Sequence, residues 1–122
     1  MADKLIIVVA NIELSHADQL LTPLSQAATA VAMEYEVEVI FSGLASQLAS
    51  KKFAQSIYTR GSDIQTALQL IQHAKSAGVI FKVCMSTIDT PNHDLLAEID
   101  ETVGSAYVIT EAMDDSVVTF TY

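Results

Sequence analysis

The sequence predicts an α/β protein: a three-layer α/β/α sandwich built on a mostly parallel, five-stranded sheet. Two observations support this class. Short apolar segments rich in β-branched residues alternate with segments of helical periodicity, which is the pattern of βαβ units. The first segment, Lys4–Ala10, contains a continuous apolar run, as expected of a strand that is buried on both faces. No repeat, low-complexity tract or linker divides the 122 residues, so we expect a single domain over residues 1–122.

Five strands are predicted, at Lys4–Ala10, Val37–Phe41, Val79–Val83, Ala106–Ile109 and Val117–Thr121. Helices are predicted between them, over residues 22–35, 44–54, 63–77 and 94–100. Met33, in the first helix, is expected to lie in the core. Because strands and helices alternate along the chain, the strands are expected to run parallel, with helices on both faces of the sheet.

Three signals place the ends of the two main helices. Thr22 is expected to cap the first helix, with Pro23 at its first helical position. Asp63 is expected to cap the helix over residues 63–77, and Ile64 to begin its buried stripe. Gly78 follows the last turn of this helix, where a glycine commonly ends a helix in the left-handed conformation.

The charge balance excludes several classes of partner. Six basic residues against fifteen acidic ones give a net charge of −9, which repels nucleic-acid phosphates and anionic lipid. The sequence contains no apolar run long enough for a transmembrane helix, and its start lacks the features of a signal peptide. We therefore expect no nucleic-acid partner and no membrane association. A cytoplasmic location is expected, and a single free cysteine suits a reducing compartment.

Several common chemistries lack their residues. A GxGxxG turn, a P-loop and a GxSxG nucleophile elbow are all missing from the sequence. The three histidines, His16, His73 and His93, are widely spaced, and one cysteine allows neither a disulfide nor a CxxC motif. We therefore expect neither a metal nor a cofactor.

The single cysteine, Cys84, stands where sites of α/β proteins are usually found. Ligands of open α/β sheets bind beyond the carboxyl ends of the strands, and Cys84 directly follows the predicted third strand. Other candidate binding residues follow the first three predicted strands: Asn11, Ser42, Gly43, Met85 and Ser86. Of these, Asn11 and Ser42 are expected to donate hydrogen bonds to the sulfur. A helix N-terminus close to Cys84 would stabilise its thiolate.

Two histidines are candidate helpers for Cys84 as a nucleophile. His93 is the first choice as a proton acceptor and His16 the second, since both follow strands at the carboxyl edge. Each residue also has a simpler interpretation. Cysteine is among the most frequently buried residues, and histidines in polar loops are commonly exposed to solvent. The residues alone therefore leave open whether Cys84 is a nucleophile or a structural side chain.

The chain resembles the DsrE/DsrF-like proteins, which include the TusBCD sulfur-relay subunits. The likeness covers nearly the whole length and depends on the order and spacing of five segments: Lys4–Val9, Leu20–Leu24 leading into Ala27–Met33, Tyr35–Phe41, Ile71–Gly78, and Val83 with Cys84. It is similar to the single-domain branch in particular. The segment Met85–Pro91 differs from the small-residue stretch ending in Arg-Gly that follows the cysteine in the best-known members.

The resemblance implies a five-stranded α/β fold that assembles as homotrimers or hexamers. It also implies that Cys84 accepts sulfane sulfur as a persulfide and passes it to a partner thiol, for example that of a TusA-like carrier. We therefore expect an intracellular sulfurtransferase-like carrier with a sulfur donor protein and an acceptor protein as partners. Two alternatives remain: a non-catalytic assembly or regulatory subunit, and a small-molecule-binding module in which Cys84 is structural.

Overall fold

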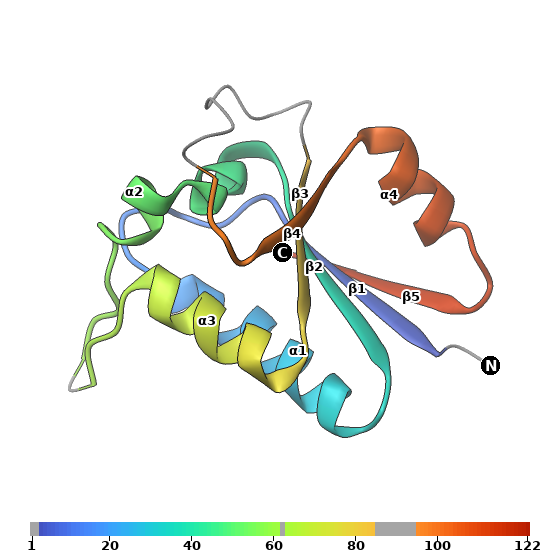
Figure 1. Cartoon of the computed structure of the whole chain (residues 1–122), viewed down its shortest axis with the longest axis horizontal. Helices are drawn as coiled ribbons and strands as arrows, with labels where there is room; N and C mark the ends of the chain where they lie inside the picture. Colours follow the sequence, from blue (N-terminus) through green and yellow to red (C-terminus); the bar gives the residue numbers. More distant parts are fainter. Residues whose placement is uncertain (1–2, 62, 85–94) are drawn as a thin grey trace.

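A computed structural model describes residues 3–61, 63–84 and 95–122. Within them, five strands form one sheet: β1 (Lys4–Val9), β2 (Glu36–Phe41), β3 (Ile80–Cys84), β4 (Ile99–Val103) and β5 (Val117–Thr121). The strand order is β4-β3-β2-β1-β5, and every neighbouring pair is parallel (Figure 1). The predicted five-stranded parallel α/β sheet is therefore confirmed.

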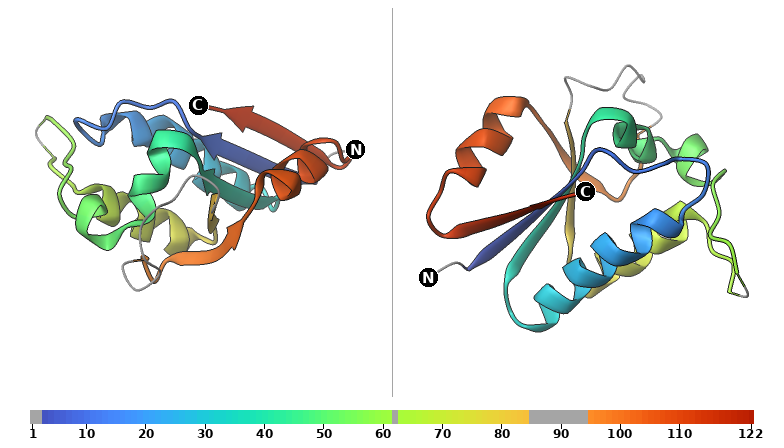
Figure 2. Two further views of the ribbon diagram at one scale, coloured as in Figure 1. Left: turned by 90° about the horizontal axis from the view of Figure 1, so that it is seen from above. Right: turned by 180° about the vertical axis from the view of Figure 1, so that it is seen from behind.

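Helices lie on both faces of the sheet. They are η1 (Asp18–Leu20), α1 (Leu21–Ala32), η2 (Gly43–Ala49), α2 (Lys51–Ala54), α3 (Ala67–Ala77) and α4 (Ser105–Ala112), where η denotes a 3₁₀ helix. The two longest, α1 and α3, lie side by side on one face, and α4 lies on the opposite face (Figures 1 and 2). None of these helices is long and apolar enough to cross a bilayer.

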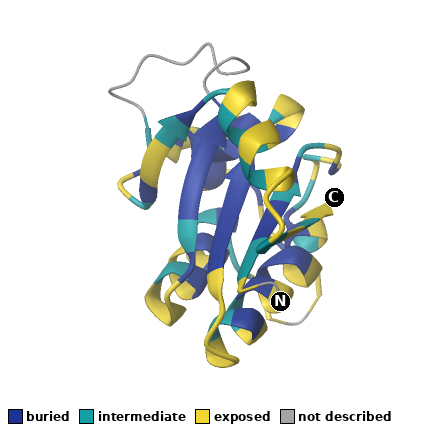
Figure 3. Ribbon diagram, turned by 90° about the vertical axis from the view of Figure 1, so that its right-hand side faces the viewer, coloured by how far each residue is buried: buried dark blue, intermediate teal, exposed yellow. Residues whose placement is uncertain are grey.

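The two faces of the sheet bury very different amounts of apolar surface. The face under α1 and α3 forms the main core, in which Phe41 of β2 stacks on Phe81 of β3 with ring centroids 5.7 Å apart. The face under α4 has a small core of three buried residues, Ile6, Ile40 and Val103. Figure 3 shows this side of the molecule, with α4 in front of the buried strands. None of the residues of α4 is itself buried.

Two elements of the C-terminal third were predicted in the wrong place. A helix was expected over residues 94–100 and a strand at Ala106–Ile109, but the structure has the strand β4 at Ile99–Val103 and the helix α4 at Ser105–Ala112. β4 is an edge strand, so it carries exposed Asp100 and Glu101 between its buried residues, and these charges obscured the strand pattern. The β-propensity of the segment at 106–109 was overridden by its packing against the sheet.

The predicted helix starts were also wrong. α1 begins at Leu21 without a side-chain cap, because the turn of η1 runs directly into it, so Thr22 and Pro23 lie inside its first turn. α3 is capped by Thr66 rather than Asp63, in a reciprocal capping box with Gln69. Two expected core residues are exposed: Ile64 precedes the helix and is 64% exposed, and Met33 is 61% exposed.

Gly78 ends α3 as predicted, with φ of +116°. A Cβ atom at this position would lie 3.0 Å from Cγ1 of Val31, in addition to the strain of a left-handed conformation. We expect Gly78→Ala to lower the free energy of unfolding by about 1–2 kcal/mol, measured by urea denaturation. Gly104→Ala is the matched control, because Gly104 has φ of −113° and open space around its Cα. A loss of equal size in both variants would contradict this explanation.

Candidate functional site

Cys84 is the last residue of β3, one position earlier relative to the strand than predicted, and it is 3% exposed. On one side it pairs with Val103 of β4. On the other side, Phe41 pairs with Val83, so Ser42 lies in register beside Cys84. Neighbouring strands are about 4.8 Å apart, which places Ser42 and Val103 within van der Waals reach of the cysteine.

Cys84 belongs to the face of the sheet that carries α4. Side chains alternate along a strand, so Cys84 shares this face with Lys82, and its neighbour Val103 is part of the small core under α4. Directly after Val103, Gly104 caps α4 without any side-chain hydrogen bond. The N-terminus of α4 therefore lies at the carboxyl edge of the sheet, one strand away from the sulfur.

The predicted site residues that follow β1 and β2 are Asn11, Ser42 and Gly43. They lie at the same carboxyl edge of the sheet as Cys84. The backbone N–H of Ser42 donates to the carbonyl of Val9 over 2.9 Å, and the N–H of Asn11 donates to the carbonyl of Tyr122 over 2.9 Å. Gly43 has φ of +56°, and a Cβ there would lie 3.3 Å from the carbonyl oxygen of Ala10. The turns after β1 and β2 are thus packed against each other beside the end of β3.

Of the two predicted histidine helpers, the structure describes His16. His16 belongs to a cluster in which its Nδ1 accepts from the N–H of Asp18 over 3.3 Å and its Nε2 lies 3.1 Å from the guanidinium of Arg60. The backbone N–H of Arg60 also donates to Asp18 over 2.7 Å. His93, together with Met85 and Ser86, lies outside the described residues.

A partly buried network of charged and polar side chains lies between α4 and the sheet, and the sequence analysis missed it. Its centre is Glu38 of β2, whose side chain is 5% exposed and accepts from Lys4 at 2.8 Å and Lys82 at 3.1 Å. The hydroxyl of Tyr107 donates to Glu38 over 2.7 Å and accepts from Lys82 over 2.7 Å. Glu111 accepts from Lys4, so two residues of α4 are bound to three strands.

The network keeps Glu38, Lys4 and Lys82 charged at neutral pH. Burial alone raises the pKa of Glu38, but hydrogen bonds from Lys4, Tyr107 and Lys82 outweigh burial and hold the pKa below its usual range. Burial lowers the pKa of Lys4 and Lys82, yet hydrogen bonds to Glu111 and Glu38 for Lys4, and to Tyr107, Glu101 and Glu38 for Lys82, raise both above the ordinary value. The network therefore attaches α4 to the sheet through the Lys4–Glu111 ion pair and the hydrogen bonds of Tyr107, on the face where the apolar core is small.

A signal for this network was present in the sequence. Glu38 and Lys82 each stand inside a predicted central strand between apolar residues. A charged residue buried in a sheet requires a partner of opposite charge, so these two residues in adjacent strands predict an ion pair. Tyr107 and Glu111 were not predicted as partners, because residues 106–109 were assigned to a strand and Glu111 to the turn or short helix after it.

The described residues contain no group of three His, Cys, Asp or Glu side chains arranged to bind a metal ion. The chemistry that this part of the chain supports at the carboxyl edge is that of one thiol. The surroundings of the thiol are the Ser42 turn, the apolar Val103 and the N-terminus of α4.

An all-parallel five-stranded sheet in the order β4-β3-β2-β1-β5, with helices on both faces, defines an α/β protein of the DsrE-like fold. The chain is similar to the crystal structure of the ychN protein from E. coli, with 13% identity, a TM-score of 0.68 and 100% of both chains covered. It is also similar to BT1422 from Bacteroides thetaiotaomicron, a conserved protein of unknown function, with 12% identity, a TM-score of 0.66 and 98% and 95% of the two chains covered. No protein-family model and no curated protein sequence matches the chain. The likenesses confirm the fold that the sequence predicted.

Proposed function

We propose that this protein carries sulfane sulfur as a persulfide on Cys84 and transfers it to the thiol of a partner. The observation that carries the proposal is the position of Cys84 at the carboxyl edge of the sheet, in register with Ser42 and one strand from the start of α4. The DsrE-like fold supports it, because the sequence resemblance to sulfur-relay proteins covers the same segments.

Two exchange steps make up the proposed transfer. The Cys84 thiolate attacks the terminal sulfur of a donor persulfide, the sulfur–sulfur bond of the donor breaks, and the donor leaves as a thiolate. An acceptor thiolate then attacks the terminal sulfur on Cys84, which regenerates the Cys84 thiolate. Each step exchanges one sulfur–sulfur bond for another, so neither needs an external oxidant or reductant.

The surroundings of Cys84 suit this chemistry. The free N–H groups at a helix N-terminus carry partial positive charge and stabilise a nearby thiolate, and α4 begins beside the cysteine. Ser42 supplies a hydroxyl next to the sulfur in register.

The proposed partners follow from the resemblance. A sulfur donor protein and an acceptor such as a TusA-like carrier would meet the carboxyl edge of the sheet in the cytoplasm. The protein itself would act as a homotrimer or hexamer. Asn11, Gly43, Met85 and Ser86 are proposed as further contacts for the sulfur, and His93 and His16 as its proton acceptors.

Intact-mass spectrometry after exposure to polysulfide tests the proposal. We expect adducts in steps of about 32 Da on the wild-type protein, removed by dithiothreitol and missing from Cys84→Ser. Because Cys84 is the only cysteine, this single substitution removes every thiol and serves as a complete control. A wild-type protein that gains no such adducts, or adducts that persist in Cys84→Ser, would refute the proposal.

A non-catalytic assembly subunit is the second candidate, and the burial of Cys84 favours it. The two functions differ in the rate at which iodoacetamide alkylates the thiol. An activated thiolate reacts faster in the folded protein than in urea, whereas a structural cysteine is protected by folding and reacts more slowly. Slow alkylation of the folded protein, together with no persulfide adduct, would establish the second candidate.

A further inference from the structure

The outer side of α4 carries an apolar stripe that no described part of the protomer covers. Tyr107 and Glu111 bind the network on the inner side, so the opposite side presents Ala106, Ile109 and Met113, together with Thr110. Their spacing of i, i+3, i+4 and i+7 is that of a helix stripe that packs against other residues. Ile109 is nevertheless 63% exposed and Met113 is 78% exposed.

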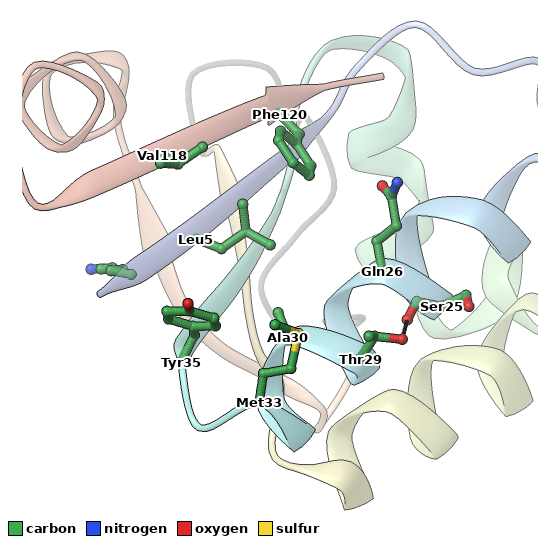
Figure 4. Close-up of a pocket in the computed structure, with 10 residues that line it drawn as sticks. Leu5, Ser25, Gln26, Thr29, Ala30, Met33, Tyr35, Val118 and Phe120 are labelled. Atoms are coloured by element: carbon green, nitrogen blue, oxygen red, sulfur yellow. Dashed lines mark hydrogen bonds between the residues drawn. The ribbon is translucent and has the colours of Figure 1, made fainter. Parts of the chain in front are cut away.

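A matching apolar groove lies on the other face of the sheet, between α1 and β5. Its volume is about 400 Å³, and Figure 4 shows side chains of the strands and of α1 pointing toward one another across it. The floor is formed by Leu5, Val118 and Phe120, and Met33 of α1 forms part of one wall. At one end a hydrogen bond joins the Tyr122 hydroxyl to Gln26.

The groove exists because the helix layer on this face is incomplete. The main core extends from α1 and α3 over β1, β2 and β3, whereas β5 lies at the sheet edge beyond α1. Val118 and Phe120 of β5 therefore remain 43% and 40% exposed. Packed helices are about 8–10 Å apart, so a further helix beside α1 would complete the layer over β5.

The stripe and the groove are both poor in charged residues. Charged residues make up 17% of the chain, yet α1 has none between Leu21 and Ala32. Among the described residues that line the groove, Lys4 is the one cation, and it is paired with Glu36, Glu38 and Glu111. Glu111 is the one charged residue of α4. Two copies that each carry a net charge of −9 repel each other, so contact between them favours surfaces depleted of charge.

We propose that the stripe of α4 in one copy of this protein occupies the groove between α1 and β5 of a second copy. The inserted α4 supplies the apolar helix that the layer over β5 lacks. Stripe and groove are different surfaces on opposite faces of the sheet, so the contact is heterologous and repeats head to tail from copy to copy. The inference specifies the surfaces of the proposed homo-oligomer and holds whether or not Cys84 carries sulfur.

Size-exclusion chromatography with light scattering tests the contact. We expect the wild-type protein to have a mass of at least three protomers, and Met113→Glu in the stripe or Met33→Glu in the groove to reduce it to the protomer mass of 13.2 kDa. Both side chains are exposed in the protomer, so neither change should unfold it, and circular dichroism verifies this. Ile64→Glu is the matched control, because Ile64 is 64% exposed but belongs to neither surface.

Mixing the two variants tests the heterologous arrangement. Met113→Glu keeps an intact groove, and Met33→Glu keeps an intact stripe, so an equimolar mixture is expected to form a dimer of twice 13.2 kDa through one intact contact. Persulfide loading of the same samples reports separately on Cys84. A monomeric wild type, an oligomer that survives either substitution, or a mixture that stays monomeric would overturn the proposal.

Discussion

Glu38→Leu is expected to lower the free energy of unfolding by about 3 kcal/mol, because it removes the buried carboxylate that Lys4 and Lys82 share. Removal of one partner from a buried ion pair leaves an uncompensated charge, which is more costly than the pair is stabilising. Lys4 retains Glu111 and Lys82 retains Glu101, so the expected loss is at the lower end of the usual range. Urea denaturation at neutral pH measures it.

Glu101→Leu is the matched control for this prediction. Glu101 lies 3.1 Å from the same Lys82, but its side chain is 58% exposed, and exposed ion pairs contribute about 1 kcal/mol or less. A loss in Glu38→Leu no larger than the loss in Glu101→Leu would contradict the role assigned to the network.

The pH dependence of stability provides a second measurement on the same variant. The pKa of folded Glu38 lies below its ordinary value of 4.5, so its contribution to stability is complete above that pH and declines as the pH falls through the folded pKa. In Glu38→Leu this part of the acid destabilisation should be missing, and the stability curves of variant and wild type should converge in acid. Parallel curves below pH 4.5 would contradict the shift.

Phe41→Ala is expected to lower the free energy of unfolding by about 3–5 kcal/mol. Phe41 is fully buried in the central part of the sheet and stacks on Phe81 at 5.7 Å between ring centroids. The truncation removes this contact and leaves a cavity in the main core. Phe41 also directly precedes Ser42, so the loss is expected to loosen the carboxyl edge beside Cys84 and to lower persulfide loading.

Tyr58→Ala provides the comparison for Phe41→Ala. Tyr58 is an aromatic residue that is 52% exposed, and its substitution is expected to cost roughly 1 kcal/mol or less. Thermal unfolding followed by circular dichroism would rank the two variants. Equal losses would contradict the placement of Phe41 in the core.

The sequence predicted the N-terminal two thirds of the fold well, for a physical reason. β1 and β2 are buried on the main-core face and rich in β-branched residues. Such an apolar run identifies a buried strand from neighbouring residues alone. Gly78 ends α3 because only glycine adopts its left-handed conformation without strain. The prediction failed at β4, where an edge strand carries charges, and at α4, whose inner contacts are mainly polar.

The candidate site could be predicted only in part. The position of Cys84 at the end of a strand follows from the chain order, since parallel strands bring their carboxyl ends to one edge. That α4 begins beside Cys84 did not follow, because the segment over residues 106–109 has the residue types of a strand. The contacts of His16 with Arg60 and Asp18 did not follow either, because no sequence spacing reveals them.

The sequence by itself determined the fold class, the strand pattern of the central sheet and the presence of a single thiol, because each depends on local composition and periodicity. Tertiary structure decided which face of the sheet Cys84 belongs to and which residues neutralise Glu38. It also decided which apolar side chains stay exposed on α4 and in the groove beside β5. These features depend on pairs of residues far apart in the chain, and such pairs are chosen by packing and charge in three dimensions rather than by neighbouring sequence.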